Sequence, residues 1–275
     1  MLCAVTGAWV GCETNPYTER TQLLLLPLSS EIQLGGQAYQ QVLKDPKTRL
    51  SQDPKEIEPV KRIAARLIEA TKQSRYADTA KRFTWDVSVI KDDKTANAFA
   101  LPGGKIAVYT GIFPVAKTEA GLAAVLGHEV VHALARHGAE RMSQGLVAQI
   151  ALNAAAIGLQ LKGSDPQTSS AIMQALGLGA QVGVLLPFSR AHESEADHVG
   201  IILAAQAGYD PREAIRLWER MEQAGGGQPQ EFLSTHPSHG TRIKQLQEWM
   251  PEALSYYDRV PHAPSQPLPA LDKAS

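Results

Sequence analysis

The sequence predicts an α+β fold that is mainly α-helical, with a small antiparallel sheet and one helix that carries the motif H-E-x-x-H. Apolar residues recur at helical spacing over most of the chain, and alternating runs typical of strands are confined to residues 83–113. The 275 residues suffice for one large domain with tails. Because the two cysteines, Cys3 and Cys12, both lie near the start, packing rather than disulfide bonds must stabilise the body of this fold.

Local patterns place each element along the chain. Pro102, Gly103 and Gly104 separate two extended pieces, which we expect to form a hairpin. The expected elements, in order, are a helix from about Glu31 to Pro46, a helix from Pro54 over "PKEIEPVKRIAARLIEATKQS", a strand in "FTWDVSVIKDD", the hairpin "NAFALPGGKIAVYTGIF", the motif helix from about Thr118 to Gly138, and helices over 189–207, 211–224 and 241–250.

Three domain-level segments follow from composition. Residues 17–250 are expected to form a single domain, into which residues 145–188 insert an apolar helical hairpin, and residues 251–275 form a proline-rich tail. Residues 1–16 resemble a bacterial lipoprotein signal in which Cys12 would carry the lipid anchor. The alternatives for that opening stretch are an apolar N-terminal strand or a truncated start.

The inserted hairpin and the net charge bear on partners. Glutamine and asparagine interrupt both apolar segments of residues 145–188, which favours a buried or surface-lying hairpin over two membrane spans. Membrane association through this hairpin or through Cys12 is therefore one expectation. The formal net charge of -1, without long blocks of like charge, excludes a basic surface for nucleic acid.

The segment "AAVLGHEVVHALARHG" carries the chemistry. His128 and His132 are four residues apart and therefore project from the same face of a helix, close enough to bind one ion. In the motif H-E-x-x-H, two imidazoles bind Zn²⁺ and the glutamate, here Glu129, takes a proton from the attacking water. Burial of these polar groups among apolar neighbours would cost a few kcal/mol unless they are bonded. The pattern therefore predicts one zinc ion per chain.

A third ligand must come from elsewhere, and "SRAHESEADHVG" is the best candidate. Glu193 and Asp197 share a helix face, whereas Glu195 points about 200° away from Glu193, so only one of the two glutamates can reach the metal. We expect Glu193 to be the ligand and Asp197 to accept the N–H of a ligating histidine. His137 is nine residues after His128, off the metal face, and is expected to be a helix-end residue.

Hydrolysis also requires a donor that stabilises the oxyanion formed at the substrate carbonyl. His236 in "STHPSHG" is the candidate, with His239 and Arg242 as substitutes. If His236 can move, it could also occupy the fourth position of the metal and keep the site idle. A surface-loop histidine without any such role is the alternative.

With these residues the chain resembles the M48 family of zinc metallopeptidases. The matching segments are "NAFALPGGKIAVYTGI", "LGHEVVHALARHGAER", "FSRAHESEADHVG" and "FLSTHPSHGTRI". The resemblance implies a zincin-like peptidase fold over residues 17–250, the ligands His128, His132 and Glu193, and an edge strand for substrate at Asn97, Ala98, Phe99 and Ala100.

The resemblance also implies a biological setting. It is strongest to envelope-facing, often lipid-anchored members that degrade misfolded or unassembled proteins, which predicts a periplasmic quality-control endopeptidase. Two other functions remain open at this point: a chaperone-like assembly factor with a structural or latent zinc site, and an integral membrane protease.

Overall fold

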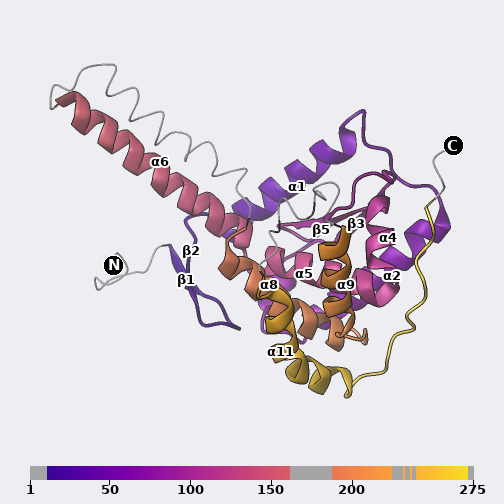
Figure 1. The fold of residues 1–275 in the computed structure, drawn as a ribbon. Helices are drawn as coiled ribbons and strands as arrows, with labels where there is room; N and C mark the ends of the chain where they lie inside the picture. Colours follow the sequence, from indigo (N-terminus) through magenta and orange to yellow (C-terminus); the bar gives the residue numbers. More distant parts are fainter. Residues whose placement is uncertain (1–10, 162–187, 225–231, 233–235, 237–239, 272–275) are drawn as a thin grey trace.

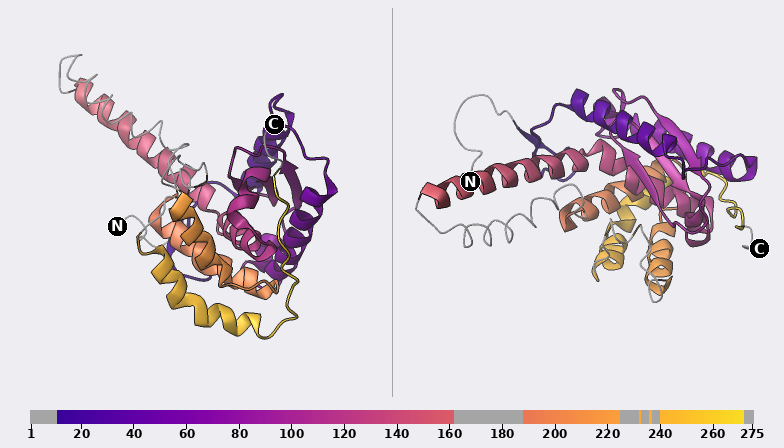
Figure 2. Two further views of the ribbon diagram at one scale, coloured as in Figure 1. Left: turned by 45° about the vertical axis from the view of Figure 1, so that its right-hand side comes forward. Right: turned by 90° about the horizontal axis from the view of Figure 1, so that it is seen from above.

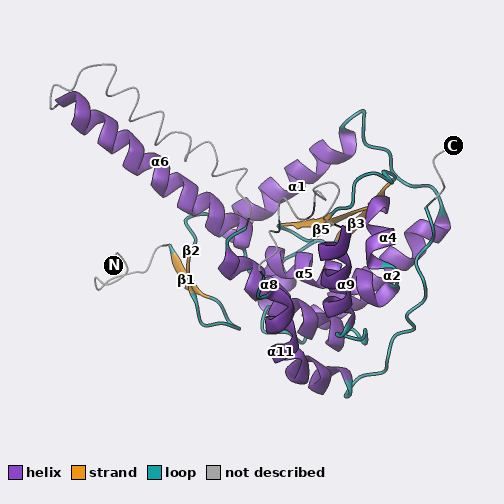
Figure 3. Cartoon of the chain, in the orientation of Figure 1, coloured by secondary structure: helices purple, strands orange, loops and turns teal. Residues whose placement is uncertain are grey.

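The computed structural model describes residues 11–161, 188–224, 232, 236 and 240–271. Helices surround a small sheet, so the described chain has the predicted α+β, mainly helical architecture (Figure 3). Its elements are β1 (Cys12–Thr14), β2 (Thr21–Leu23), α1 (Leu28–Lys44), α2 (Pro54–Thr71), α3 (Ala77–Ala80), β3 (Asp86–Ile90), β4 (Ala98–Leu101), β5 (Lys105–Tyr109), a 3₁₀ turn η1 (Thr110–Ile112), α4 (Phe113–Ala116), α5 (Glu119–Leu134), α6 (His137–Leu161), α8 (Arg190–Gln206), α9 (Glu213–Ala224) and α11 (Arg242–Tyr257).

The main sheet has the strand order β3-β5-β4. Strands β4 and β5 form the predicted antiparallel hairpin, in which Ala98 pairs with Val108. The turn between them contains Gly103 and Gly104 at φ of 86° and 81°, a left-handed conformation that favours glycine. Strand β3 pairs with β5 in parallel, so the sheet is mixed rather than purely antiparallel. The difference arises because β4 lies at the far edge, and the chain reverses twice between β3 and β5.

Helices cover both faces of this sheet, as the two views in Figure 2 show. Alternate residues of β5 point to opposite faces. Ala107 packs in a cluster with Tyr39 of α1, whereas Ile106 and Val108 belong to the larger core formed with α2 and α5. Strand β4 is at the edge of the sheet beside α5, the helix that carries the motif, and no strand among the described residues pairs with its outer edge.

Helix α5 is buried along its whole length and packs against α8. The two backbones meet at Gly127 and Gly200: a Cβ built on Gly127 would lie 2.8 Å from the carbonyl oxygen of Gly200, and one on Gly200 would lie 2.9 Å from the nitrogen of His128. Neither position has room for a side chain. This contact brings the motif helix and the acidic segment of α8 together.

The motif helix ends earlier than the sequence suggested. Helix α5 stops at Leu134, and Arg136 adopts a left-handed backbone with φ of 60° before α6 starts at His137. Such a conformation is unfavourable for arginine. Ion pairs of its guanidinium with Glu13 and Glu31 offset that cost. The expected helix end at Gly138 is therefore wrong.

Helix α6 projects away from the rest of the molecule (Figure 1). It contains the first limb of the apolar hairpin expected at residues 145–188, and the second limb lies outside the described residues. No helix within the described ranges is both long and apolar enough to cross a membrane.

The C-terminal segment differs from the tail expected at residues 251–275. Helix α11 includes Pro251 and continues to Tyr257 before the chain becomes extended. The extended part then pairs with the start of α5: the N–H of Glu119 donates to the carbonyl of Gln266 at 2.9 Å, and the N–H of Leu268 donates to that of Lys117 at 2.9 Å. We call residues 263–268 the C-terminal strap.

The contact between α5 and α8 can be tested with glycine substitutions. Gly200→Ala should lower the free energy of unfolding by about 1–3 kcal/mol, because the added methyl meets the backbone of His128. Gly36→Ala is the matched control, since Gly36 lies within helix α1 with nothing within 4 Å of its Cβ position, and it should be neutral or stabilising. Urea unfolding of both variants measures the difference. Equal stabilities would contradict the close helix contact.

Candidate metal centre

Four donor side chains converge where α5 meets α8. His128 and His132 lie on one face of α5, Glu193 lies in the first turn of α8, and His236 belongs to the segment before α11. Their ligand atoms all lie within 4.8 Å of one another, and all four residues are buried. The structure thus brings together the three ligands expected from the sequence and adds a fourth donor.

The spacing of these atoms fits a tetrahedral zinc site. The Nε2 atoms of His128 and His132 are 3.0 Å apart, and Glu193 Oε1 is 3.3 Å from His132 Nε2. Glu193 Oε2 is 3.6 Å from His128 Nε2. Two ligands bound at about 2.0–2.2 Å in tetrahedral geometry are roughly 3.3 Å apart. Nitrogen and carboxylate donors at this spacing suit Zn²⁺.

His236 completes the cluster through its Nδ1 atom. This atom is 3.2 Å from His128 Nε2 and 3.0 Å from Glu193 Oε1, so it lies at the fourth corner of the donor set. Two phenylalanines hold the imidazole between them, since its ring stacks on Phe232 at 4.6 Å and on Phe188 at 5.3 Å. The N–H of His236 also donates to the carbonyl of Phe232 at 2.9 Å, which fixes the backbone one turn away.

Glu129 lies next to the donors without joining them. Its Oε1 is buried and is 3.3 Å from His236 Nε2, and no other residue that the structure describes bonds to it. The backbone N–H of Ala100, in the edge strand β4, faces this carboxylate and acts to lower its pKa. Burial raises the pKa of Glu129 above the usual value for a glutamate. A buried carboxylate that lies beside the metal donors without binding among them is suited to receive a proton from a reacting group.

Two further side chains fix the ligands. Asp197 Oδ1 is 2.9 Å from His128 Nδ1, so this carboxylate accepts the N–H of the imidazole, as the spacing on α8 suggested. Arg242, expected only as a substitute oxyanion donor, instead donates to Glu193 at 3.1 Å and to Asp197 at 2.7 Å. Its guanidinium lies 3.4 Å from the ring centre of Trp218. Arg242 therefore neutralises the two carboxylates.

The charges of the ligands follow from their neighbours. Burial would raise the pKa of Glu193, but hydrogen bonds to His132 and His236 outweigh it and hold that pKa far below the usual range. Burial lowers the pKa of His132, which keeps its imidazole neutral as a ligand should be. Burial would also lower the pKa of His236, but the carboxylates of Glu129 and Glu193 raise it. Glu193 is thus anionic beside the neutral imidazole of His132.

The remaining expected residues lie as follows. Ala98, Phe99 and Ala100 are in the edge strand β4, and Asn97 directly precedes it. Cys12 is the first residue of strand β1 and does not belong to the metal cluster. His239 lies outside the described residues.

The expectation that His137 lies at the end of the motif helix is wrong. This residue begins α6, is fully buried, and places its Nδ1 3.0 Å from His132 Nδ1. Burial lowers its pKa to about 4, so the imidazole is neutral at pH 7. On a continuous helix it would point away from His132; the break at Arg136 turns it back. No glycine or proline between Leu134 and His137 marks that break in the sequence.

Comparison with known proteins identifies the family. The model of peptidase family M48 matches residues 54–250. The mitochondrial metalloendopeptidase OMA1 of Schizosaccharomyces pombe is 39% identical over 245 residues, which cover 88% of this chain and 67% of that protein. That of Saccharomyces cerevisiae is 30% identical, over 89% of this chain and 70% of its own length. The β-barrel assembly-enhancing protease of Yersinia pestis is 31% identical over 54% of this chain and 31% of its own.

These relatives overturn the expected periplasmic location. Proteins named as mitochondrial OMA1 match at higher identity or over more of this chain than the bacterial protease, and they point to a mitochondrial rather than a periplasmic setting. The expectation was wrong because the motifs behind it are those of the peptidase domain, and these carry no information about compartment. The family match and the relatives show that the chain belongs to peptidase family M48 and is a zinc-dependent metalloendopeptidase.

Proposed function

We propose that this metalloendopeptidase cleaves unfolded or unassembled proteins, as a quality-control protease, at a site formed by His128, His132, Glu193 and Glu129. The observation that carries the proposal is the outer edge of β4, which no described strand pairs with and where the N–H of Ala100 faces the carboxylate of Glu129. Since the location that pointed to envelope substrates is contradicted, the proposal is stated for unfolded polypeptide as such. The name of the Yersinia relative, an assembly-enhancing protease, supports a role on unassembled proteins.

The edge strand favours extended substrates. A peptide that pairs with the free edge of β4 must be extended over several residues, which a folded protein does not offer. Strand β5 already occupies the other edge of β4. A peptide at the free edge would run past Glu129 and the metal donors, so its carbonyl groups would approach the site from the side of Ala100.

The residues divide the chemistry among them. His128, His132 and Glu193 would hold the zinc ion, which when bound supplies a Lewis acid that polarises a carbonyl and acidifies water. Glu129 Oε1, which is buried beside the donors, would take the proton of the attacking water and deliver it to the leaving amine. Asp197 and Arg242 hold His128 and Glu193 in place. Phe188 and Phe232 exclude water beside His236.

A second candidate function is a latent or structural zinc site in a chaperone-like assembly factor. The observation that favours latency is the position of His236 Nδ1, within 3.2 Å of two other donor atoms. With all four donors bound, no position would be open for substrate. For turnover, His236 would have to leave this corner, and its ring could then serve the oxyanion as the sequence suggested.

The proposal includes contact with a membrane surface. Leu146, Val147 and Ile150 on α6 are 49%, 46% and 58% exposed, and the chain has no charged residue between Arg141 and Lys162. The part of α6 that follows Arg141, uncharged and with these large apolar side chains exposed, suits a lipid surface. Lipidation of Cys12 would add a second anchor, which mass spectrometry of the native protein would detect.

Glu129→Gln tests the general base. The variant should retain zinc but cleave unfolded casein at least about 100-fold more slowly, because the amide cannot accept the proton. Zinc content and cleavage are measured on the same samples. His132→Ala should lose both zinc and activity, whereas Glu222→Gln, on an exposed position of α9, should change neither. Full activity of Glu129→Gln would refute the assignment.

His236→Ala separates latency from oxyanion stabilisation. If the histidine closes the site, the variant should bind zinc through the remaining donors and cleave casein faster than the wild type. Loss of an oxyanion donor would instead lower kcat about 100- to 1000-fold. From its position among the donors we expect the faster variant. His198→Ala, which removes a histidine paired with Glu252 outside the metal cluster, is the control and should leave the rate unchanged.

Vesicle flotation tests the membrane contact. The double variant Leu146→Gln, Ile150→Gln should bind phosphatidylcholine vesicles more weakly than the wild type, because it removes exposed apolar surface from α6. Leu34→Gln is the matched control, since Leu34 is 45% exposed on α1. Equal flotation of the double variant and the wild type would exclude α6 as the contact.

A further inference from the structure

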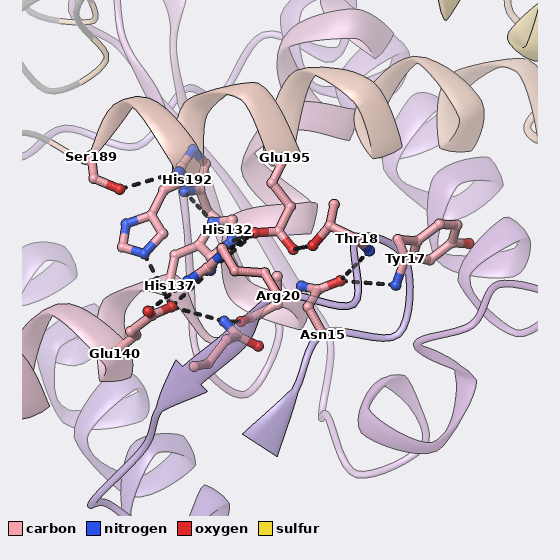
Figure 4. Close-up of polar contacts among 12 residues, drawn as sticks. Asn15, Tyr17, Thr18, Arg20, His132, His137, Glu140, Ser189, His192 and Glu195 are labelled. Carbon is pink, nitrogen blue, oxygen red and sulfur yellow. Dashed lines mark hydrogen bonds and ion pairs between the residues drawn. The ribbon is translucent and has the colours of Figure 1, made fainter. Parts of the chain in front are cut away.

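We infer that His137 is a positioning residue for the ligand His132, as the central member of a buried relay that runs from His132 through His137 to Glu195 and is fixed by Arg20. The inference rests on the proposed function only in assigning His132 as a zinc ligand. It adds residues from the N-terminal segment and from the start of α6 to the machinery of the site (Figure 4).

Hydrogen-bond contacts join each member of the relay to the next, and all its members are buried. His132 Nδ1 lies 3.0 Å from His137 Nδ1, and His137 Nε2 lies 3.3 Å from Glu195 Oε2. The two imidazole rings are nearly perpendicular, at 78° and 4.9 Å between centres. All three residues are at most 3% exposed, so water does not compete for these contacts.

The direction of each hydrogen bond follows from the metal site. His132 directs Nε2 at the other donor atoms, so its proton must be on Nδ1, which donates to His137 Nδ1. Because Nδ1 of His137 accepts this hydrogen bond, the proton of His137 is on Nε2, which donates to Glu195. The opposite tautomer of His137 would set two N–H groups against each other and leave this oxygen of Glu195 without the imidazole donor. The metal site and the relay thus select the same tautomers.

The imidazole of His137 is required because of the geometry of α8. Glu193 and Asp197 share the face that meets the metal donors, and Asp197 contacts His128 directly. Glu195 points to the other side of the helix, about 200° from Glu193. It bonds to His137, and through that ring it supports His132. Each histidine ligand therefore has a carboxylate behind it, one direct and one through an imidazole.

The N-terminal segment fixes the far end of the relay. Thr18 Oγ1 donates to Glu195 Oε1 at 2.8 Å, and Arg20 donates to Glu195 Oε2 through Nη2 at 3.0 Å and Nε at 3.2 Å. Arg20 also binds both oxygens of Glu140, at 2.6 and 2.8 Å. Because Glu195 accepts from both ends, its orientation toward His137 depends on residues more than 170 positions away in the sequence.

A matched pair of histidine variants tests the relay. His137→Phe keeps a buried ring but removes both nitrogens, and it should weaken zinc binding about 10- to 100-fold. His192→Phe is the control. The ring of His192 stacks on that of His137 at 4.5 Å, but its Nε2 bonds to Glu140 at 3.1 Å and not to a member of the relay. This variant should retain the wild-type zinc affinity. Competition with a chromophoric chelator measures the affinities.

A second readout reports on the ligand itself. With Co²⁺ in place of zinc, the visible absorption of His137→Phe should shift relative to the wild type, whereas that of His192→Phe should not. Arg20→Met should weaken zinc binding less than His137→Phe, and the two changes should not be additive, because they act through one relay. If His137→Phe fails to fold, Arg20→Met, whose side chain is 26% exposed, provides the test.

Two results would overturn the inference: wild-type zinc affinity in His137→Phe and Arg20→Met, or an equal loss in His192→Phe, which would indicate general destabilisation. Failure of the proposed function looks different. In that case the wild type binds zinc with the expected dependence on His137, yet does not cleave unfolded casein, or cleaves it equally well as Glu129→Gln.

Discussion

The backbone contact between helices α5 and α8 at Gly127 and Gly200 is the constraint on which the site depends. The oxygens of Glu193 on α8 lie 3.3 Å from His132 Nε2 and 3.6 Å from His128 Nε2 on α5, and the close approach of the two backbones allows this. Gly200 meets the backbone of His128 itself, so the place of closest packing is also the place where a ligand is attached. In this fold the packing of small residues decides whether the acid of one helix reaches the imidazoles of the other.

The same contact buries several carboxylates, and arginines from the two ends of the chain compensate their charge. Helix α8 buries the carboxylates of Glu193, Glu195 and Asp197. Arg20, between β1 and β2, pairs with Glu195. Arg242, the first residue of α11, pairs with Glu193 and Asp197. An unpaired buried charge would cost several kcal/mol, so these partners are needed before any cation binds. The metal centre is thus supported by segments that contribute no ligand.

Local sequence rules gave the parts of the site that lie on one helix at a time. The four-residue spacing placed His128 and His132 on one face, and the angular argument on α8 separated Glu193 from Glu195; the structure has the same arrangement. The break before α6 could not be predicted, because the left-handed backbone of Arg136 is held by acids more than 100 residues away. His137 remained hidden for the same reason. The mixed sheet likewise depends on a long-range pairing, β3 with β5.

The C-terminal strap determines when, during synthesis of the chain, the motif helix can be fully anchored. Its bonds to Lys117 and Glu119 secure the beginning of the helix that bears both histidines. During translation these partners become available only after residue 268 has left the ribosomal tunnel, roughly 150 residues behind the helix that they hold. A chain synthesised only part of the way therefore has an incompletely anchored metal centre, and the start of the motif helix is secured only when residues 263–268 can reach it.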